Sequence, residues 1–226
     1  MAVTLEVTLS LHDIKLMLIF WQSIMEMNGS TVVAMLGKDC VAIASDTRFG
    51  VQQLTVDNQF DRIFKINDNC YVGMPGLATD VSTVVQKLKM RTNMYALREE
   101  RDISPKVFTS LVSSLLYEHR FGYYFVEPII AGLQGPEKTP FISNMDLIGA
   151  TTTPSDFVVA GSCPEALFGI CETYWKPNME QEELFETVAQ CLLCAQDRDC
   201  LAGWGAVVHI ITPKGTIIRK LRARQD

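Results

Sequence analysis

The stretch NGSTVVAMLGKDCVAIASDTRFG, from Asn28 to Gly50, decides how this chain folds. Two apolar segments, near residues 31–36 and 40–46, are expected to form neighbouring strands. Side chains alternate across a strand, so Asp46 at the end of the second segment shares a face with three small residues: Cys40, Ala42 and Ala44. That face leaves space beside the Asp46 carboxylate.

Gly29-Ser30, just before the first strand, has two interpretations. Cleavage between them would free a serine that carries both a hydroxyl nucleophile and an α-amine that can serve as its base. If the bond stays intact, the pair is only an irregular lead into the strand. The residues around it leave both interpretations open.

The remaining periodic segments predict an α+β fold. Further strands are expected near 62–66 and 70–74, followed by amphipathic helices around 81–88 and from Ser104-Pro105. Strands follow at 128–133, 140–148 and 156–160, then helices from Ser162 and over 181–197, then strands at 206–212 and 215–221. Ser162 and Glu165, three residues apart, predict a capping box with Ser162 as the N-cap of the third helix.

Each helix pair has one apolar side to cover. Two sheets packed face to face, with one helix pair outside each, cover both sides, so the sequence predicts a four-layer αββα sandwich. Because strands and helices are grouped rather than alternating, a doubly wound parallel fold is disfavoured.

Composition indicates one globular domain. The chain has 226 residues, 48% of them hydrophobic and 20% charged. The formal net charge of −6 argues against nucleic acid as a partner, because phosphate binding requires a basic face. A basic run closes the chain and is interpreted as a solvated strand and tail: Arg219, Lys220, Arg222 and Arg224.

Seven cysteines, an odd number, do not indicate a disulfide framework and favour a reducing compartment. Cys191 and Cys194 form a CxxC, but only Cys200 is near them, so we interpret them as small buried residues rather than a zinc site. Leu16–Trp21 is too short to cross a bilayer, and no basic cluster precedes it. We expect a soluble intracellular chain with no membrane partner and no cofactor or metal; residues 1–22 are an N-terminal extension without an assigned role.

Several blocks of sequence resemble the proteasome β subunits: CVAIASDTRFG (40–50), GLATD (76–80), DFVVAGSC (156–163) and DRDCLAGWGAVVHII (197–211). Three more make the type-3 β subunits of the eukaryotic 20S core the most similar: YEHRFG (117–122), EPIIAGL (127–133) and MDLIG (145–149). The resemblance implies a short propeptide-like lead at 23–29 and a β-subunit domain at 30–226. The family fold is the αββα sandwich of N-terminal nucleophile hydrolases, in agreement with the element order.

The resemblance also implies site positions. Active members need a glycine before the nucleophile, a hydroxyl nucleophile, an aspartate that holds a lysine, that lysine, and a later serine, aspartate and serine. In this chain those positions hold, in the same order, Gly29, Ser30, Asp46, Arg62, Ser162, Asp199 and Ala202.

Arg62 stands where the family's lysine would be, and it decides the interpretation. A buried lysine can lose its proton, whereas a guanidinium cannot. We expect Arg62 to pair with Asp46 or to fill the space over Ser30. Ala202 removes one more hydroxyl from a network whose members act together. We therefore expect no catalytic residue and an inactive, vestigial site.

Simpler roles also remain for these residues. Asp46 could cap a turn with Thr47 and Arg48, and Asp199 could anchor the end of the fourth helix. His119 and His209 have no carboxylate or cysteine at a telling spacing, so we interpret both as surface or packing residues.

The implied function is that of a structural subunit in ubiquitin-dependent protein degradation, in the cytoplasm and nucleus. Its partners would be β2-like and β4-like neighbours in a seven-membered ring, the α-ring subunits and the opposite β ring. Asp146 would line a neighbour's substrate pocket, where its charge favours a basic side chain. Two alternatives stay open: a weakly active N-terminal serine hydrolase after cleavage at Gly29-Ser30, and a free-standing interaction domain.

Overall fold

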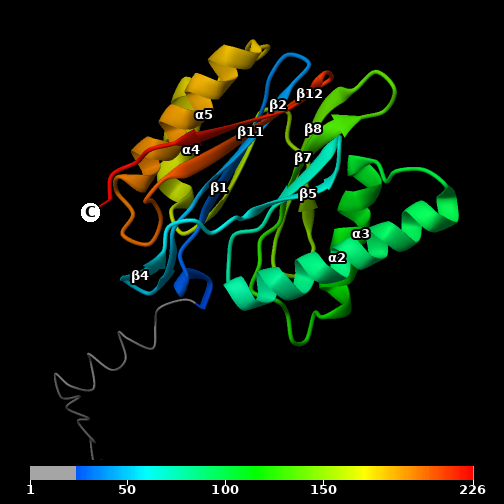
Figure 1. Ribbon diagram of the computed structural model, residues 1–226, viewed down its shortest axis with the longest axis horizontal. Helices are drawn as coiled ribbons and strands as arrows, with labels where there is room; N and C mark the ends of the chain where they lie inside the picture. The colour runs from blue at the N-terminus through cyan, green and yellow to red at the C-terminus, as the bar shows by residue number, and fades with distance from the viewer. Residues whose placement is uncertain (1–23, 226) are drawn as a thin grey trace, which may run out of the picture.

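The computed structural model describes residues 24–225, and the predicted extension at 1–22 lies outside the described residues. Figure 1 shows two sheets stacked in the middle of the molecule with a helix pair on each outer side. This is the predicted α+β sandwich of four layers, αββα, and the prediction is confirmed.

Both sheets are antiparallel and five-stranded. The first has the spatial order β10 (Phe157–Gly161), β1 (Thr31–Leu36), β2 (Val41–Asp46), β11 (Ala206–Thr212) and β12 (Gly215–Leu221). The second has the order β5 (Ile63–Asn67), β6 (Cys70–Gly73), β7 (Ile129–Gln134), β8 (Thr139–Met145) and β9 (Thr151–Thr152). A separate hairpin consists of β3 (Phe49–Val51) and β4 (Leu54–Asp57).

Four α-helices form the outer layers of the described chain. Helices α2 (Ala78–Glu99) and α3 (Pro105–Glu118) cover the second sheet, and α4 (Pro164–Tyr174) and α5 (Gln181–Gln196) cover the first. A short 3-10 helix, η1 (Ile24–Glu26), precedes β1. Pro105 opens α3 directly after Ser104, as predicted, because proline is tolerated where the helix N–H would be unsatisfied.

Alternation along the central strands produces the layers. Val32 and Ala34 of β1, together with Val41 and Ile43 of β2, face the second sheet and pack with Ile129 and other residues of its inner face. Ala42 and Ala44 point the other way and pack under α4 and α5, which confirms the predicted faces of β2. Fully burying an aliphatic side chain of this kind contributes about 1.5–3 kcal/mol, so a one-residue slip in register would be strongly destabilising.

Two predictions about local structure are wrong. The strand expected at 140–148 ends at Met145, because the chain turns at Asp146 and then enters β9. The capping box at Ser162 does not form: α4 begins at Pro164 with Cys163 in the N-cap position, and no side chain caps it. The Ser162 hydroxyl is used elsewhere, as described below.

The two cysteines of the CxxC motif lie in different environments. Cys191 is buried in the core as predicted, but Cys194, three residues on, is exposed. Residues 24–225 contain no group of three or more His, Cys, Asp or Glu side chains placed to hold a metal ion. Within the same residues, no helix has the length and apolar character needed to cross a bilayer.

Candidate functional site

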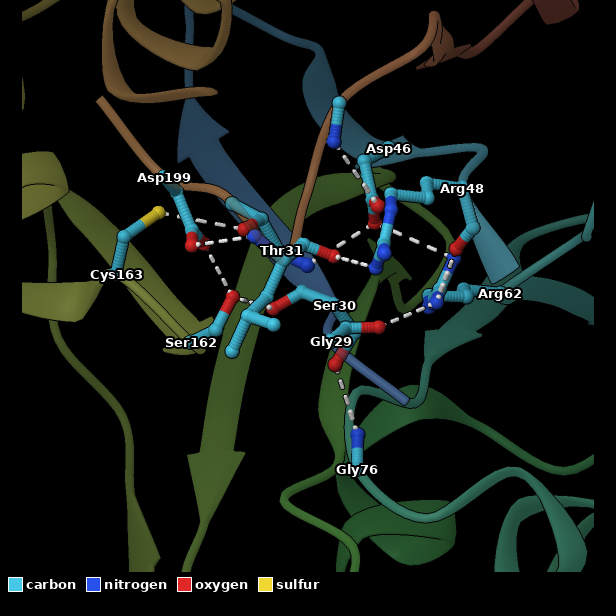
Figure 2. Close-up of polar contacts among 12 residues, drawn as sticks. Gly29, Ser30, Thr31, Asp46, Arg48, Arg62, Gly76, Ser162, Cys163 and Asp199 are labelled. Carbon is cyan, nitrogen blue, oxygen red and sulfur yellow. Dashed lines mark hydrogen bonds and ion pairs between the residues drawn. The ribbon is translucent and has the colours of Figure 1, made fainter. Parts of the chain in front are cut away.

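The start of β1 lies where the two sheets and two loops meet. Ser30 is 1% exposed, and its Oγ accepts a hydrogen bond from the Gly76 N–H at 2.9 Å. Its carbonyl oxygen accepts two more, from the Ser162 N–H at 2.7 Å and from the Ser162 hydroxyl at 3.1 Å. Ser30 is therefore fixed from both sides, as Figure 2 shows.

A buried ion pair lies beside Ser30 at the ends of two strands. Asp46 is the last residue of β2, and Arg62 directly precedes β5. The distance between Asp46 Oδ1 and Arg62 Nη1 is 3.3 Å. The side chains are 0% and 2% exposed. Arg62 therefore pairs with Asp46, which is the first of the two arrangements predicted from the sequence.

Asp46 and Arg62 also bind the backbone around the site. The carboxylate accepts the N–H of Thr31 at 3.0 Å and that of Gly203 at 3.4 Å. Arg62 Nη2 donates to the carbonyl oxygen of Gly29 at 2.5 Å and to that of Arg48 at 2.6 Å. The arginine thus holds the carbonyl of the very bond that cleavage would break (Figure 2).

Burial dominates the electrostatics of this pair. It raises the pKa of Asp46 above its ordinary value, against the opposing effects of the Arg62 charge and of backbone N–H donors. Burial also lowers the pKa of Arg62, against the attraction of Asp46 and together with repulsion from the Arg48 charge. A guanidinium does not give up its proton in proteins, so Arg62 remains a cation and cannot take up a proton from Ser30.

Ser162 and Asp199 form a second polar pair on the other side of Ser30. The Ser162 hydroxyl donates to Asp199 Oδ2 at 2.5 Å, and Asp199 Oδ1 accepts the Leu201 N–H at 2.9 Å. Asp199 lies just beyond α5, so it fixes the loop that follows that helix. The Ser162 hydroxyl is directed at these two acceptors, Asp199 and the Ser30 carbonyl, and it accepts no N–H group of α4.

Ala202, the last of the site positions implied by the resemblance, lies in the loop after α5. Ala202 is buried, and both of its neighbours in the chain bind site residues. The Leu201 carbonyl accepts a hydrogen bond from Arg48 Nη1 at 2.7 Å, and the Gly203 N–H donates one to Asp46. An alanine there brings no hydroxyl to the network. The structure thus brings Ser30, Asp46, Arg62, Ser162 and Asp199 together, with Ala202 in the loop that lies against them; that this site is vestigial stays a prediction.

The segment before Ser30 is part of the site. Asn28 is 6% exposed, and its side chain donates to the Gly50 carbonyl at 2.9 Å while accepting the Ala78 N–H at 3.0 Å. Gly29 has a positive φ of 60°, and a Cβ at this residue would lie 2.0 Å from the Leu201 carbonyl oxygen. Only glycine fits here, which is a structural reason for the residue that is independent of cleavage.

Sequence reasoning missed several members of this network. Arg48 is 1% exposed, and its guanidinium donates to Thr55, Leu201 and Gln52. The sequence offered Arg48 only as a turn residue beside Asp46. Asn28 and Gly76 carried no signal, because their partners lie 22 to 50 residues away along the chain.

Asp146 lies outside this network. It is exposed in the turn between β8 and β9, where its Oδ1 accepts the N–H groups of Ile148 at 3.0 Å and Ala150 at 2.7 Å. Its charge helps burial to raise the pKa of Glu127. The carboxylate thus closes its own turn and also carries a surface charge.

The two histidines singled out in the sequence pack against aromatic rings. His119 contacts Tyr124, with ring centroids 4.7 Å apart, and His209 contacts Tyr71 at 5.6 Å. Neither contacts the network around Ser30. Among the hydrogen bonds of the described residues, the partner of Ser30 Oγ is a backbone N–H and not a base.

Comparison with known proteins agrees with this architecture. A family model described as "Proteasome subunit" matches residues 26–211. Curated relatives named "Proteasome subunit beta type-3" are 55% identical in Dictyostelium discoideum, 56% in Picea mariana and 52% in Drosophila melanogaster. Each alignment extends over 204 residues, which is 90% of this chain and 100% of the relative. The chain therefore belongs to the proteasome subunit family.

Proposed function

We propose that this chain is a non-catalytic structural β subunit of the 20S proteasome core, which serves ubiquitin-dependent protein degradation. The single observation that carries the inactive assignment is the position of Arg62. Its guanidinium is buried, paired with Asp46, and bonded to the carbonyl oxygen of Gly29. A permanent cation thus occupies the place where the chemistry would need a proton acceptor.

Two further features support the absence of chemistry. General acid–base help is commonly worth about 10²–10⁴ in rate. Within residues 24–225, the hydrogen-bond partner of Ser30 Oγ is the Gly76 N–H, which cannot act as a base. Ala202 also removes the final hydroxyl of the proton network. Asp46, Ser162 and Asp199 then have structural roles, because each ties backbone segments together around Ser30.

The relatives' names support assembly with other proteasome subunits. On the resemblance to type-3 subunits, we place the chain in a seven-membered β ring between type-2-like and type-4-like neighbours, in contact with α-ring subunits and the opposite β ring. The cytoplasm and nucleus are the compartments that this role implies. The odd number of cysteines, seven, favours a reducing compartment, which is compatible with both.

A second element of the proposal concerns Asp146. Its exposed carboxylate would border the substrate pocket of the type-2-like neighbour and favour a basic side chain there. The turn that Asp146 closes keeps this charge at the end of β8, on a rigid element of the second sheet.

The amino terminus of the native chain tests the proposal. We expect tryptic digestion of the purified particle to give a peptide that ends at Lys38 and contains Gly29-Ser30 as an internal bond. A peptide that begins at Ser30 would contradict the proposal and support the N-terminal serine hydrolase. Sedimentation of a native extract tests the other alternative, because a free-standing domain would migrate at the mass of the 25.3 kDa chain.

A further inference from the structure

The two sheets part at the end of the sandwich that lies far from Ser30. Ser30 and Asp46 lie at one end of the first sheet, where β11 also begins. From there β11 runs over seven residues to Thr212, a length of roughly 20 Å. At that far end, Lys138 Nζ donates to the Pro213 carbonyl at 2.6 Å, so the β7–β8 turn and the β11–β12 turn lie side by side (Figure 1).

A hollow lies at this end, between the edge strands of the two sheets. Strand β12 is an edge of the first sheet and β5 is an edge of the second. The hollow has a volume of about 480 Å³ and is lined by residues of β5, β6, β11, β12 and the turns that connect these strands and β7 to β8. Its volume lies within the range of about 300–1,000 Å³ that is typical of small-molecule sites.

Three ammonium groups meet at this hollow, although the chain has a formal net charge of −6. Lys65 comes from β5, Lys138 from the β7–β8 turn and Lys214 from the β11–β12 turn. Among residues 24–225, Lys138 has no carboxylate partner, and Lys214 has neither an ion pair nor a hydrogen bond. The single carboxylate of the lining is that of Asp68, which lies 2.7 Å from Lys65 Nζ. The hollow therefore carries a net positive charge and attracts anions.

A buried hydroxyl also faces this hollow. Tyr71 of β6 is paired with Lys65 across the strands, so both side chains point toward the first sheet. Tyr71 is 4% exposed, and its ring packs against His209 of β11. Within residues 24–225 the Tyr71 hydroxyl has no hydrogen-bond partner, yet Tyr71 lines the hollow. Buried tyrosine hydroxyls usually have a partner, so this donor indicates an acceptor that comes from outside the chain.

The wall opposite Lys65 is partly apolar. Ile218 of β12 is paired with His209 and therefore also faces the second sheet, and 56% of it is exposed. Pro213 adds apolar surface at the β11–β12 turn. The hollow thus combines ammonium groups at its mouth, a hydroxyl inside and apolar atoms on one side. We call it the lysine hollow and define it by Lys65, Tyr71, Lys138 and Lys214.

We propose that the lysine hollow binds the phosphate group of a small phosphate ester, with the organic part of the ester against Pro213 and Ile218. Three ammonium groups and the Asp68 carboxylate leave two positive charges, which match the charge of about −1.5 to −2 on a phosphate monoester. Lysine binds phosphate as a point charge, and the Tyr71 hydroxyl donates to a phosphate oxygen. The site lies at the opposite end of the sandwich from Ser30, so this inference goes beyond the proposed function and does not depend on it.

The test measures the acylation rate of single lysines in the purified native particle. An amine-reactive N-hydroxysuccinimide ester is applied in the presence of AMP, inorganic phosphate or adenosine, and peptide mass spectrometry gives the rate at each lysine. We expect AMP at about four times its dissociation constant to slow acylation of Lys138 and Lys214 about fivefold, because about one-fifth of the sites are then free. Inorganic phosphate should protect the same lysines at higher concentration, since it lacks the apolar contacts. Adenosine should not protect them, because it carries no phosphate.

Lys38 is the control within the same chain. It lies in the β1–β2 turn, at the same end of the first sheet, where it is exposed and paired with Glu180 outside the lysine hollow. Its acylation rate reports any general effect of ionic strength and should not depend on AMP.

Tyr71→Phe tests the buried hydroxyl and keeps the ring against His209. We expect the AMP concentration that gives half-protection to rise about tenfold, the usual effect of losing a hydrogen bond to a charged group. An unchanged AMP concentration in this variant would overturn the proposed site.

Four other outcomes would also overturn the proposal: no protection by AMP, protection by AMP but none by inorganic phosphate at any concentration, protection by adenosine, or equal protection of Lys38. If Lys138 and Lys214 fail to react even without AMP, the hollow is closed in the particle and the proposal is wrong as well. None of these outcomes concerns Ser30, so each leaves the proposed structural role of the chain unaffected.

Discussion

At the scale of single residues, the account depends on Arg62. One guanidinium pairs with Asp46, holds the Gly29 carbonyl and holds the Arg48 carbonyl. A lysine has its three N–H donors on one nitrogen, whereas Arg62 uses two separate nitrogens: Nη1 faces Asp46, and Nη2 binds the two carbonyl oxygens. The guanidinium that stands in place of a proton acceptor therefore also fixes two backbone segments, at Gly29 and at Arg48.

Replacement of Arg62 tests this structural role. Arg62→Ala leaves the buried Asp46 carboxylate without its partner, so we expect the free energy of unfolding to fall by about 3–5 kcal/mol. Arg62→Lys keeps the charge, so its free energy of unfolding should fall distinctly less than that of Arg62→Ala. Urea denaturation of the purified variants measures both. Equal losses for the two variants would show that the charge at residue 62 does not stabilise the buried Asp46 as described.

Gly29 provides a test of the backbone. Gly29→Ala would place a Cβ 2.0 Å from the Leu201 carbonyl oxygen at a φ of 60°. We expect a loss of about 2–4 kcal/mol from clash and backbone strain, seen as a lower urea midpoint. Gly135→Ala is the matched control: it also has a positive φ, but nothing lies within 4 Å of its added Cβ. If the two variants lose the same stability, the close approach at Gly29 does not matter.

At the scale of elements, the sequence predicted most of what alternation and helical spacing encode. The faces of β2 follow from small residues at every second position, and the helix pairs follow from their apolar stripes. The β3–β4 hairpin was not predicted, because its aliphatic residues point outward and its inner face rests on Arg48. A pattern rule that assumes apolar residues inside cannot find such an element.

Long-range hydrogen bonds of Ser162 explain the other local error. Ser162 and Glu165 have the spacing of a capping box, yet the Ser162 hydroxyl bonds Asp199 and the Ser30 carbonyl instead. Both partners are far away along the chain, so a local rule has no access to them. The site positions themselves came from the resemblance, whereas Asn28 and Gly76 needed the folded structure.

His209 of β11 gives the first sheet a pH dependence. Burial lowers the pKa of His209 below its ordinary value of 6.5, with a smaller opposing effect from Asp61. The folded chain then holds this histidine uncharged, while the unfolded chain binds a proton more readily. Its contribution to stability is therefore present above pH 6.5 and is lost as the pH falls through the lowered pKa.

His209→Phe removes this titration and keeps a ring against Tyr71. We expect the unfolding free energy of the unmodified chain to fall more between pH 7.5 and pH 5 than that of the variant. Denaturant titrations at the two pH values measure the difference. If the unfolding free energy falls by the same amount in both proteins, the pH dependence belongs to other groups.

At the scale of the whole molecule, the proposed non-catalytic role requires the chain to act through its surfaces. Asp146→Asn tests the proposed neighbour pocket, because asparagine retains the oxygen that accepts the Ile148 and Ala150 N–H groups while the charge is lost. In the assembled particle we expect cleavage after arginine to fall about fivefold, the equivalent of about 1 kcal/mol. Cleavage after apolar residues is the control and should not change. Unaltered cleavage after arginine would contradict this role for Asp146.

The most direct test of the central claim is covalent labelling of Ser30 in the native particle. A probe that reacts with nucleophilic hydroxyls is applied to the purified assembly, and peptide mass spectrometry locates the adducts. The account predicts adducts on catalytic subunits of the same particle and none on the Ser30 peptide, because Arg62 offers no proton acceptor. An adduct at Ser30 would contradict the account and place the chain among the active hydrolases.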